Sequence, residues 1–236
     1  PLTAPLIRKL KEKMVPVISE IEFAARYTKA RKICITGANG KTTTTLLIYH
    51  ILKNAGVNVG LAGNVGKSFA LQVAMNNYDW YVLEISSFQL DSMFSFKAEI
   101  AILTNITPDH LDRYEYKFEN YINSKFRIIQ NQTHEDSFIY CLDDEVSAAN
   151  VATRNIKAQI YTTSCEPGNS SANAYLTDNK IHINIKNNLF TMTLEELALQ
   201  GKHNVYNSMA AAITSKLVDI RKESIRQSLS DFENIE

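Results

Sequence analysis

Apolar residues gather in short runs along the first two thirds of the chain, and helix-length segments separate most of these runs. The runs predict strands at 32–36, 57–62, 80–85, 100–105, 138–142 and 159–161. Between the first two, residues 41–55 carry Leu46, Leu47, Ile51 and Leu52 at helical spacing. Because strands that alternate with helices form parallel sheets covered on both faces, this order predicts an α/β fold.

The pattern changes between residues 174 and 194, where apolar and polar residues alternate with a period of two. Turn signals at Asp178-Asn179 and Asn187-Asn188 divide this segment, so we expect a small antiparallel β meander there. Helices are predicted to follow at 202–218 and 222–229. The predicted fold class is therefore a mostly parallel sheet flanked by helices, with a small antiparallel meander attached.

Composition and charge narrow the class of protein. The chain has 236 residues, of which 45% are hydrophobic and 21% charged, so it is globular rather than disordered. Lys plus Arg and Asp plus Glu balance at 25 each, which leaves no overall field to attract nucleic acid or an anionic membrane. We expect neither partner, and any anion site must be built locally.

The cysteines and the apolar runs indicate the cellular compartment of the protein. Cys34, Cys141 and Cys165 are odd in number and have no metal-ligand spacing, which argues against a disulfide framework. The longest apolar stretches are strand-sized, and no apolar run follows the basic residues near the amino terminus. We therefore expect a cytoplasmic protein.

Glycine marks the candidate site. Six of the eight glycines lie within thirty residues, at positions 37, 40, 56, 60, 63 and 66. The first two belong to the string GANGKT at 37–42, between a predicted strand and a helix start, where free N–H groups and the helix dipole favour phosphate. Lys41 would reach the terminal phosphates and Thr42 would ligate Mg²⁺. The alternative is an ordinary glycine turn into a helix.

Two more polar residues follow predicted strands, so they should reach the same edge of the sheet. Glu84 ends the run at 80–83 and is a candidate Mg²⁺ ligand beside the phosphates. Asn64, in the string GNVG, follows the strand at 57–62. Taken singly, a solvent-facing glutamate and a turn asparagine remain the alternatives.

The string TPDHLDRY at 107–114 follows another predicted strand. His110, flanked by Asp109 and Asp112, suits metal ligation, and Arg113 could neutralise a phosphate or a carboxylate. A loop histidine without a role is the alternative reading for His110.

The helix predicted after this string places a lysine among apolar residues. Phe118, Tyr121, Ile122, Lys125 and Ile129 share one face at spacings of three and four. A lysine that loses hydration needs an anionic partner or a lowered pKa. The alternative is that the stem of Lys125 packs while its head reaches solvent.

The string GKHNVYN at 201–207 opens the helix predicted at 202–218. It could present the amides of Asn204 and Asn207 to a base or a phosphate. An ordinary helix start after a glycine is the alternative.

These strings together resemble the ATP-binding central domain of the Mur ligases, which add amino acids to the peptide of the bacterial cell-wall precursor. TGANGKTTT, GNVG, LEISSFQL, LTNITPDHLDRY, YINSKFR and GKHNVYNSMAA occur in the family's order. LEISSFQL and DHLDRY resemble the branch that adds D-glutamate more than the branches that add alanine, a diamino acid or a dipeptide. The resemblance implies a phosphate-loop nucleotide-binding fold and the substrates ATP, UDP-N-acetylmuramoyl-L-alanine and D-glutamate.

The resemblance also assigns roles to individual residues. It implies that the phosphates bind to Gly37, Asn39, Gly40, Lys41, Thr42 and Thr43. One Mg²⁺ would bind to Thr42 and Glu84, and a second to His110 and to Lys125, which is carbamylated in the family. Asn204 and Asn207 would lie near the adenine. Asn64, Ser86 and Arg113 would contact substrate, and Lys41, Glu84, His110 and Lys125 would form the catalytic set.

The extent of the family suggests a division of the chain. Residues 1–32, with eight basic and three acidic residues and one helix expected at 4–13, are interpreted as the link from an amino-terminal UDP-binding domain. Residues 33–230 would form the ATP-binding domain, and 231–236 would begin the link to a third domain. We expect a monomer that is inactive without the other domains. Two alternatives stay open, namely another ligase of the superfamily, such as a folylpolyglutamate synthase, and a nucleotide switch.

Overall fold

A single mixed sheet forms the centre of the protein. The computed structural model describes residues 4–233, and within them nine strands pair in the order β2-β3-β1-β4-β5-β6-β7-β8-β9. The strands are β1 Arg31–Thr36, β2 Val59–Gly63, β3 Trp80–Glu84, β4 Ile100–Leu103, β5 Ser137–Cys141, β6 Gln159–Ser164, β7 Ala174–Thr177, β8 Lys180–Ile185 and β9 Asn188–Thr193. The predicted α/β fold with a mostly parallel sheet is confirmed.

The helices are α1 Pro5–Glu12, α2 Glu20–Ala25, α3 Lys41–Asn54, α4 Phe69–Met75, α5 Ser87–Leu90, α6 Phe118–Phe126, α7 Glu145–Thr153, α8 Lys202–Leu217 and α9 Lys222–Ser230. Short 3₁₀ turns lie at Leu111–Tyr114, Arg127–Ile129 and Leu194–Glu196. The helices predicted from the sequence at 4–13, 41–55, 202–218 and 222–229 are confirmed to within two residues at each end.

The order of the strands decides where a ligand can bind. β1 lies between β3 and β4 and pairs with both in parallel. The chain leaves β1 toward β2 and β3 on one side, and then returns to β4 on the other. A crevice opens outside the carboxyl ends of parallel strands at such a switch point. The loop after β1 therefore faces this crevice.

The meander attaches to the sheet at β6. β7 pairs in parallel with β6, whereas β8 runs antiparallel to both β7 and β9. Two-residue turns join these strands, and positive φ angles at Asp178, Asn179, Lys186 and Asn187 are those of the hairpin turns that match strand twist. The second turn lies one residue earlier than the sequence signal suggests, because Asn188 already pairs with Ile185.

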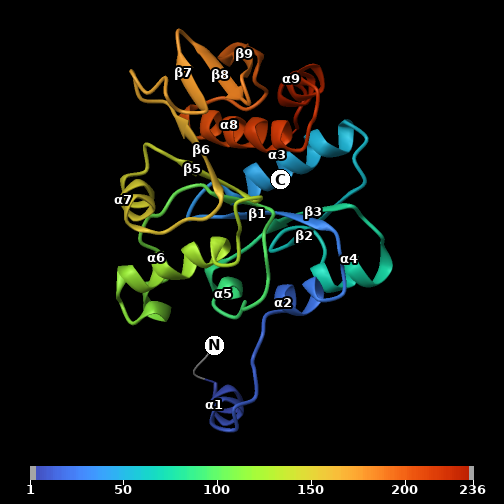
Figure 1. The fold of residues 1–236 in the computed structure, drawn as a ribbon, viewed down its shortest axis with the longest axis vertical. Helices are drawn as coiled ribbons and strands as arrows, with labels where there is room; N and C mark the ends of the chain where they lie inside the picture. Colours follow the sequence, from blue (N-terminus) through green and yellow to red (C-terminus); the bar gives the residue numbers. More distant parts are fainter. Residues whose placement is uncertain (1–3, 234–236) are drawn as a thin grey trace.

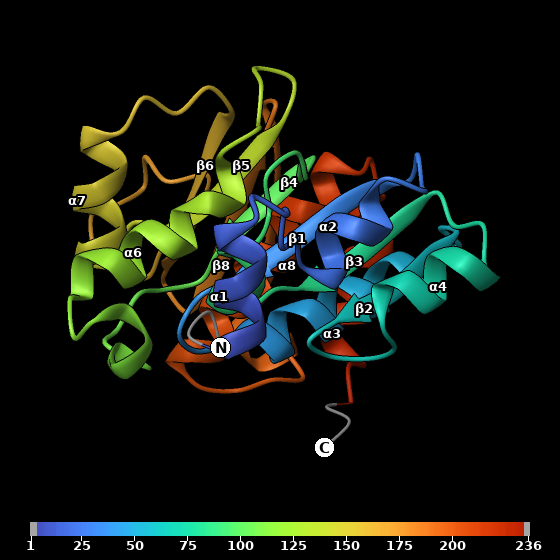
Figure 2. The ribbon, with the colours of Figure 1, turned by 90° about the horizontal axis from the view of Figure 1, so that it is seen from below.

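Two helical layers cover the sheet (Figure 1). On one face, Ile33 and Ile35 of β1 pack in a core with residues of α3, α8 and α9. On the other face, Cys34 packs in a second core that includes residues of α2, α4 and α6. Alternate residues of one strand thus enter two different cores, as the pleat of a strand requires. In Figure 2, α6 and α7 lie over one half of this second face, and α2 and α4 over the other half.

Residues 20–25 form a helix that the sequence pattern does not predict. Ser19 caps α2 by accepting a hydrogen bond from the backbone N–H of Glu22, and Ile21 and Ala24 are buried. The second half of the interpreted link therefore packs on the domain. The division of the chain at residues 32 and 230 stays a prediction.

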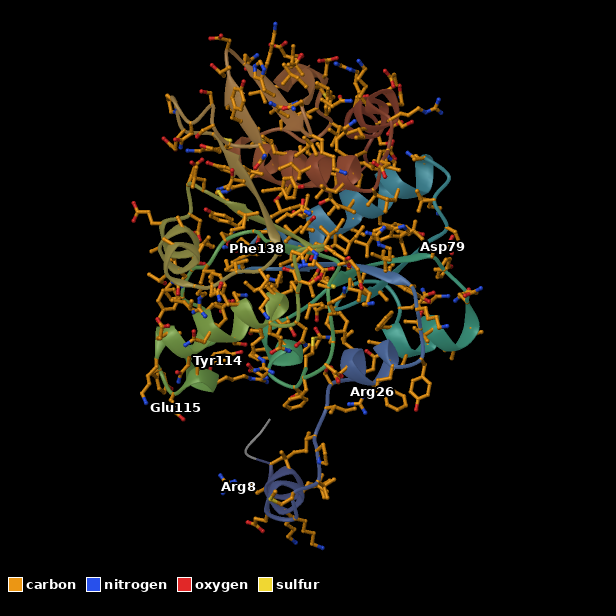
Figure 3. All side chains as sticks on the ribbon, in the orientation of Figure 1. Arg8, Arg26, Asp79, Tyr114, Glu115 and Phe138 are labelled. Carbon is orange, nitrogen blue, oxygen red and sulfur yellow. The ribbon has the colours of Figure 1, made fainter. Side chains whose placement is uncertain are left out.

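α1 lies apart from the rest of the domain, with Arg8 among its outward side chains, whereas Phe138 lies inside the molecule (Figure 3). Between residues 4 and 233, no helix is long and apolar enough to cross a membrane.

Candidate functional site

The loop after β1 has the backbone that the phosphate-loop prediction requires. Gly37 and Gly40 have φ angles of 149° and 79°, a region that residues with a side chain rarely adopt. A Cβ at Gly37 would lie 1.9 Å from Oγ1 of Thr104, so only glycine fits there. Lys41 bends back and donates from Nζ to the carbonyl oxygen of Ala38 at 2.8 Å. The loop closes on itself at the amino end of α3.

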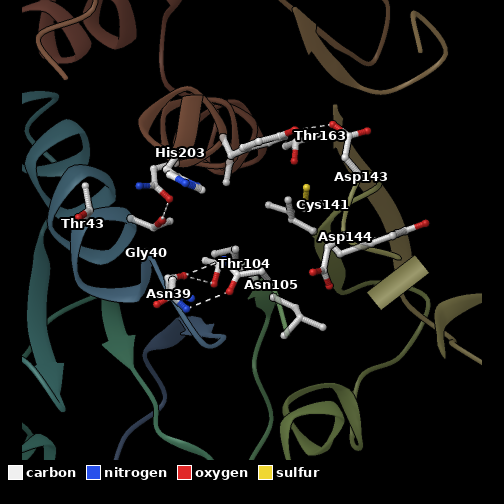
Figure 4. Close-up of a pocket in the computed structure, with 18 of the residues that line it drawn as sticks. Asn39, Gly40, Thr43, Thr104, Asn105, Cys141, Asp143, Asp144, Thr163 and His203 are labelled. Atoms are coloured by element: carbon white, nitrogen blue, oxygen red, sulfur yellow. Dashed lines mark hydrogen bonds between the residues drawn. The ribbon is translucent and has the colours of Figure 1, made fainter. Parts of the chain in front are cut away.

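The residues after β4 hold this loop in place. Thr104 donates from Oγ1 to the carbonyl oxygen of Asn39 at 2.6 Å, and the backbone N–H of Asn39 donates to Oδ1 of Asn105 at 2.9 Å. The dashed lines between Asn39, Thr104 and Asn105 in Figure 4 show this contact. Neither Thr104 nor Asn105 is assigned a role from the sequence. Their position directly after a predicted strand is the signal that could have found them.

Glu84 lies at the carboxyl end of β3, as predicted, and joins two other predicted residues. Its Oε2 accepts a hydrogen bond from Oγ1 of Thr42 at 2.7 Å, and its Oε1 accepts one from Nδ2 of Asn64 at 2.8 Å. The Glu84 side chain is buried, and both of these partners are neutral. A buried carboxylate beside a hydroxyl oxygen offers the hard oxygen donors that Mg²⁺ prefers, so these residues fit the predicted ion.

Lys125 lies on the buried face of α6, and the predicted apolar environment is confirmed. It is 2% exposed, its Nζ lies 4.6 Å from the centre of the Tyr121 ring, and it donates to the carbonyl oxygen of Gly37 at 2.6 Å. Burial, and then the nearby charge of Lys41, lower its pKa to about 7, although Asp109 opposes this shift. The buried ammonium thus contacts the phosphate loop directly, and the solvent-reaching alternative is wrong.

His110 and Arg113 lie on the surface and both contact Phe88. The His110 ring centre is 5.2 Å from that of Phe88, and the guanidinium carbon of Arg113 is 3.9 Å from the Phe88 ring centre. Nε2 of His110 approaches Oδ2 of Asp109 at 3.4 Å. No hydrogen bond joins His110 to Lys125 within residues 4–233, so their shared metal site stays a prediction.

Ser86 has a structural role in addition to its predicted contact with substrate. It caps α5: its Oγ accepts from the backbone N–H of Gln89, whose side chain accepts from the backbone N–H of Ser86. Part of Ser86 remains exposed beside Glu84. In the part of the chain that the structure describes, no group of three or more His, Cys, Asp and Glu could hold a metal. The predicted ion sites depend on other donors.

A cleft of about 710 Å³ opens between the phosphate loop, the ends of β4, β5 and β6, and the first turns of α8 (Figure 4). The predicted residues Asn39, Gly40, Thr43, Asn204 and Asn207 line it. Nδ2 of Asn207 donates to Oδ1 of Asn204 at 3.2 Å, and a Cβ at Gly40 would lie 2.7 Å from Oδ1 of Asn207. The structure thus brings the two asparagines beside the loop across more than 160 residues of chain.

The far wall of this cleft contains residues that the sequence analysis missed. Asp143 and Asp144 follow β5, and Thr163 belongs to β6. Two carboxylates directly after a predicted strand were the available signal. The cleft therefore has the predicted phosphate loop at one end and hydrogen-bonding groups at the other, an arrangement that fits a nucleotide.

Comparison with known proteins agrees with this geometry. A family model described as the Mur ligase middle domain matches residues 35–215. A UDP-N-acetylmuramoylalanine–D-glutamate ligase of Bacteroides fragilis is 56% identical over 100% of this chain and 53% of its own length. One of the same name from Porphyromonas gingivalis is 50% identical over 100% of this chain and 52% of its own. The chain spans about half the length of these curated relatives.

Solved structures share the fold. A UDP-N-acetylmuramate:L-alanyl-gamma-D-glutamyl-meso-diaminopimelate ligase from Neisseria meningitides aligns with a TM-score of 0.72 at 14% identity, over 100% of this chain and 77% of that one. A UDP-N-acetylmuramoyl-L-alanyl-D-glutamate–2,6-diaminopimelate ligase aligns with a TM-score of 0.71 at 20% identity, over 97% and 49%. At these identities the likeness shows the fold alone.

Proposed function

Because this chain belongs to the Mur ligase family, we propose that it is the ATP-binding domain of a bacterial enzyme that joins D-glutamate to UDP-N-acetylmuramoyl-L-alanine. The names of the relatives at 50–56% identity support this choice of substrates. The observation that carries the proposal is the juxtaposition of the phosphate loop, the Glu84 carboxylate and the cleft at one edge of the sheet. Such an edge can bind a nucleotide and direct its last phosphate toward a second substrate.

The reaction we propose has two steps. A carboxylate oxygen of UDP-N-acetylmuramoyl-L-alanine attacks the terminal phosphorus of ATP, and ADP leaves. The amine of D-glutamate then attacks the acyl phosphate, loses a proton and expels inorganic phosphate. In both steps the protein positions the reactants and neutralises charge.

The residues of the loop can do this work. Lys41 and the N–H groups at the start of α3 would hold the phosphates. The ammonium of Lys41 is positively charged, and the N–H groups form the positive end of the helix dipole. In this role Nζ of Lys41 exchanges the carbonyl of Ala38 for phosphate oxygen. Thr42 and Glu84 would hold Mg²⁺, which when bound neutralises phosphate charge. Asn204 and Asn207 would face the base, and Asn64, Ser86 and Arg113 would contact the muramoyl substrate.

We also propose that Lys125 is carbamylated in the working enzyme and, with His110, contributes to a second Mg²⁺ site. The neutral amine attacks carbon dioxide, an N–C bond forms, and a proton is released. A pKa of about 7 leaves a large share of this amine neutral near pH 7.5. The product is an anionic oxygen donor, which suits a hard cation where an ammonium would repel it.

Carbamylation has a direct spectroscopic test. Full-length enzyme equilibrated with carbon-thirteen-labelled bicarbonate should show a carbamate resonance that Lys125→Ala lacks and that the exposed-lysine control Lys117→Ala keeps. Lys125→Ala should also lose most of its activity. If the enzyme without any substitution gives no carbamate resonance while Lys125→Ala stays active, the proposed second metal site is rejected.

The function itself is tested by phosphate release from ATP by the full-length protein with UDP-N-acetylmuramoyl-L-alanine. We expect release only when D-glutamate is present, and none with L-glutamate, L-alanine or a diamino acid. Release with another amino acid would identify a different ligase, and release without any acceptor would favour a nucleotide switch. The monomeric state and the bacterial cytoplasm as the location stay predictions, the first open to sedimentation analysis.

A further inference from the structure

The carboxylate of Asp143 gathers three segments at the wall of the cleft opposite the phosphate loop. Its Oδ1 accepts from Oγ of Ser164 at 2.6 Å and from Nδ2 of Asn169 at 3.3 Å. Its Oδ2 accepts from the backbone N–H of Cys165 at 2.6 Å and from the hydroxyl of Tyr206 at 2.6 Å. The donors come from the end of β6, the loop after it and the second turn of α8.

These contacts fill the hydrogen-bond acceptor positions of the Asp143 carboxylate. An ionised carboxylate has about four acceptor positions, and four donors occupy them here. Burial alone would raise the pKa of Asp143, but the hydrogen bonds from Ser164, Tyr206, Cys165 and Asn169 outweigh it and lower the pKa. The group therefore keeps its charge and has no position left for a ribose hydroxyl or a base.

The contact with Tyr206 has the widest structural consequence. Tyr206 lies on α8 between Asn204 and Asn207, the two residues proposed to face the base, and it also lines the cleft. Its hydrogen bond to Asp143 ties the start of α8 to the end of β5 across 63 residues of chain. The phosphate loop lies at the other side of the cleft, where Figure 4 shows Asn39 and Gly40 across the opening from Asp143.

We propose that Asp143 is a positioning residue for the nucleoside half of ATP, holding Tyr206 and the loop after β6 so that Asn204 and Asn207 meet the base. This inference rests on the proposed function. Asp143 touches no part of the nucleotide. When its ties are lost, the two walls move independently, and the binding-competent cleft is populated for a smaller fraction of the time.

The test measures binding of ADP and of inorganic tripolyphosphate to the full-length protein by calorimetry. Asp143→Asn keeps the size of the side chain but turns an amide N–H toward donors. We expect its Kd for ADP to rise about tenfold, as for a lost hydrogen bond to a charged group, with tripolyphosphate binding unchanged. Tyr206→Phe should weaken ADP binding less, and adding it to Asp143→Asn should cause little further loss.

Asp136 provides a matched control at the other end of β5. Its carboxylate is buried and accepts hydrogen bonds from Nζ of Lys97 at 3.0 Å and from the backbone N–H of Thr133 at 2.7 Å. Asp136→Asn therefore removes a comparable set of hydrogen bonds to a buried carboxylate, at the end of β5 away from the cleft. The Kd of this variant for ADP should equal that of the protein without substitutions.

Three results would overturn the inference. These are normal ADP binding by Asp143→Asn, equal loss of ADP and tripolyphosphate binding, or equal loss in Asp136→Asn. If Asp143→Asn does not fold, Tyr206→Phe becomes the test. Normal ADP binding by Tyr206→Phe would then reject the positioning role of the hydrogen bond between Tyr206 and Asp143. Unmodified protein that binds no ADP would instead refute the proposed function and this inference with it.

Discussion

Replacing Glu22 by glutamine should show how strongly α2 is attached to the domain. The Glu22 side chain is 0% exposed, and its carboxylate accepts hydrogen bonds from the backbone N–H groups of Phe94 at 3.1 Å and Phe96 at 2.8 Å. Oγ of Ser95 donates at 2.5 Å and the guanidinium of Arg26 at 3.2 Å. Glutamine fills the same space but places an amide N–H against these donors.

The pKa of Glu22 indicates how much free energy of unfolding its carboxylate contributes. Burial raises it, but the hydrogen bonds from Ser95, Phe94, Phe96 and Arg26 prevail and lower it from 4.5 to about 2. Because the folded pKa lies below the unfolded one, the stabilisation is complete above about pH 5 and is lost as the pH falls toward 2. The shift corresponds to about 3 kcal/mol at neutral pH and to less than half of that at pH 3.

Urea unfolding of the unmodified protein and of Glu22→Gln at several pH values measures this difference. We expect Glu22→Gln to be less stable by about 3 kcal/mol at pH 7, with the gap narrowing steadily below pH 5. Glu20→Gln, an exposed neighbour that accepts from Oγ of Ser68 at 2.9 Å, should change stability by less than about 1 kcal/mol. A gap below about 0.5 kcal/mol at pH 7, or one independent of pH, would refute the reasoning.

Three further predictions concern the phosphate loop and the loop after β6. Lys41→Ala in the full-length protein should fold normally by circular dichroism but lose about 100-fold or more in phosphate release, and near-normal turnover would contradict the phosphate-loop assignment. Gly37→Ala should lower the melting temperature and abolish ADP binding in calorimetry, because its Cβ would lie 1.9 Å from Oγ1 of Thr104; unchanged binding would show that the loop tolerates a side chain. Burial raises the pKa of Cys165 to about 12, so iodoacetamide at pH 8 should alkylate it at least about 100-fold more slowly than free cysteine, as mass spectrometry can measure.

Local patterns in the sequence determined the strands, several of the helices and part of the site of this protein. Apolar runs and helical spacing predict the strands of the parallel sheet, the meander and helix α8, because these signals depend on residues a few positions apart. The phosphate loop is predictable for the same reason, since the glycines, Lys41 and Thr42 are consecutive between a strand and a helix. Counting along α6 likewise places Lys125 on its buried face, which the structure confirms.

The tertiary structure alone decided which distant residues meet. The short helix α2 has too little local signal, and its position depends on Glu22 meeting a loop more than 70 residues away. The partners of Asn39 and of Asp143 depend on β1 pairing with β4 and on α8 packing across the strand ends. Sequence periodicity specifies which face of an element is apolar. The neighbour that covers this face is set by long-range packing of the whole chain, which no local pattern encodes.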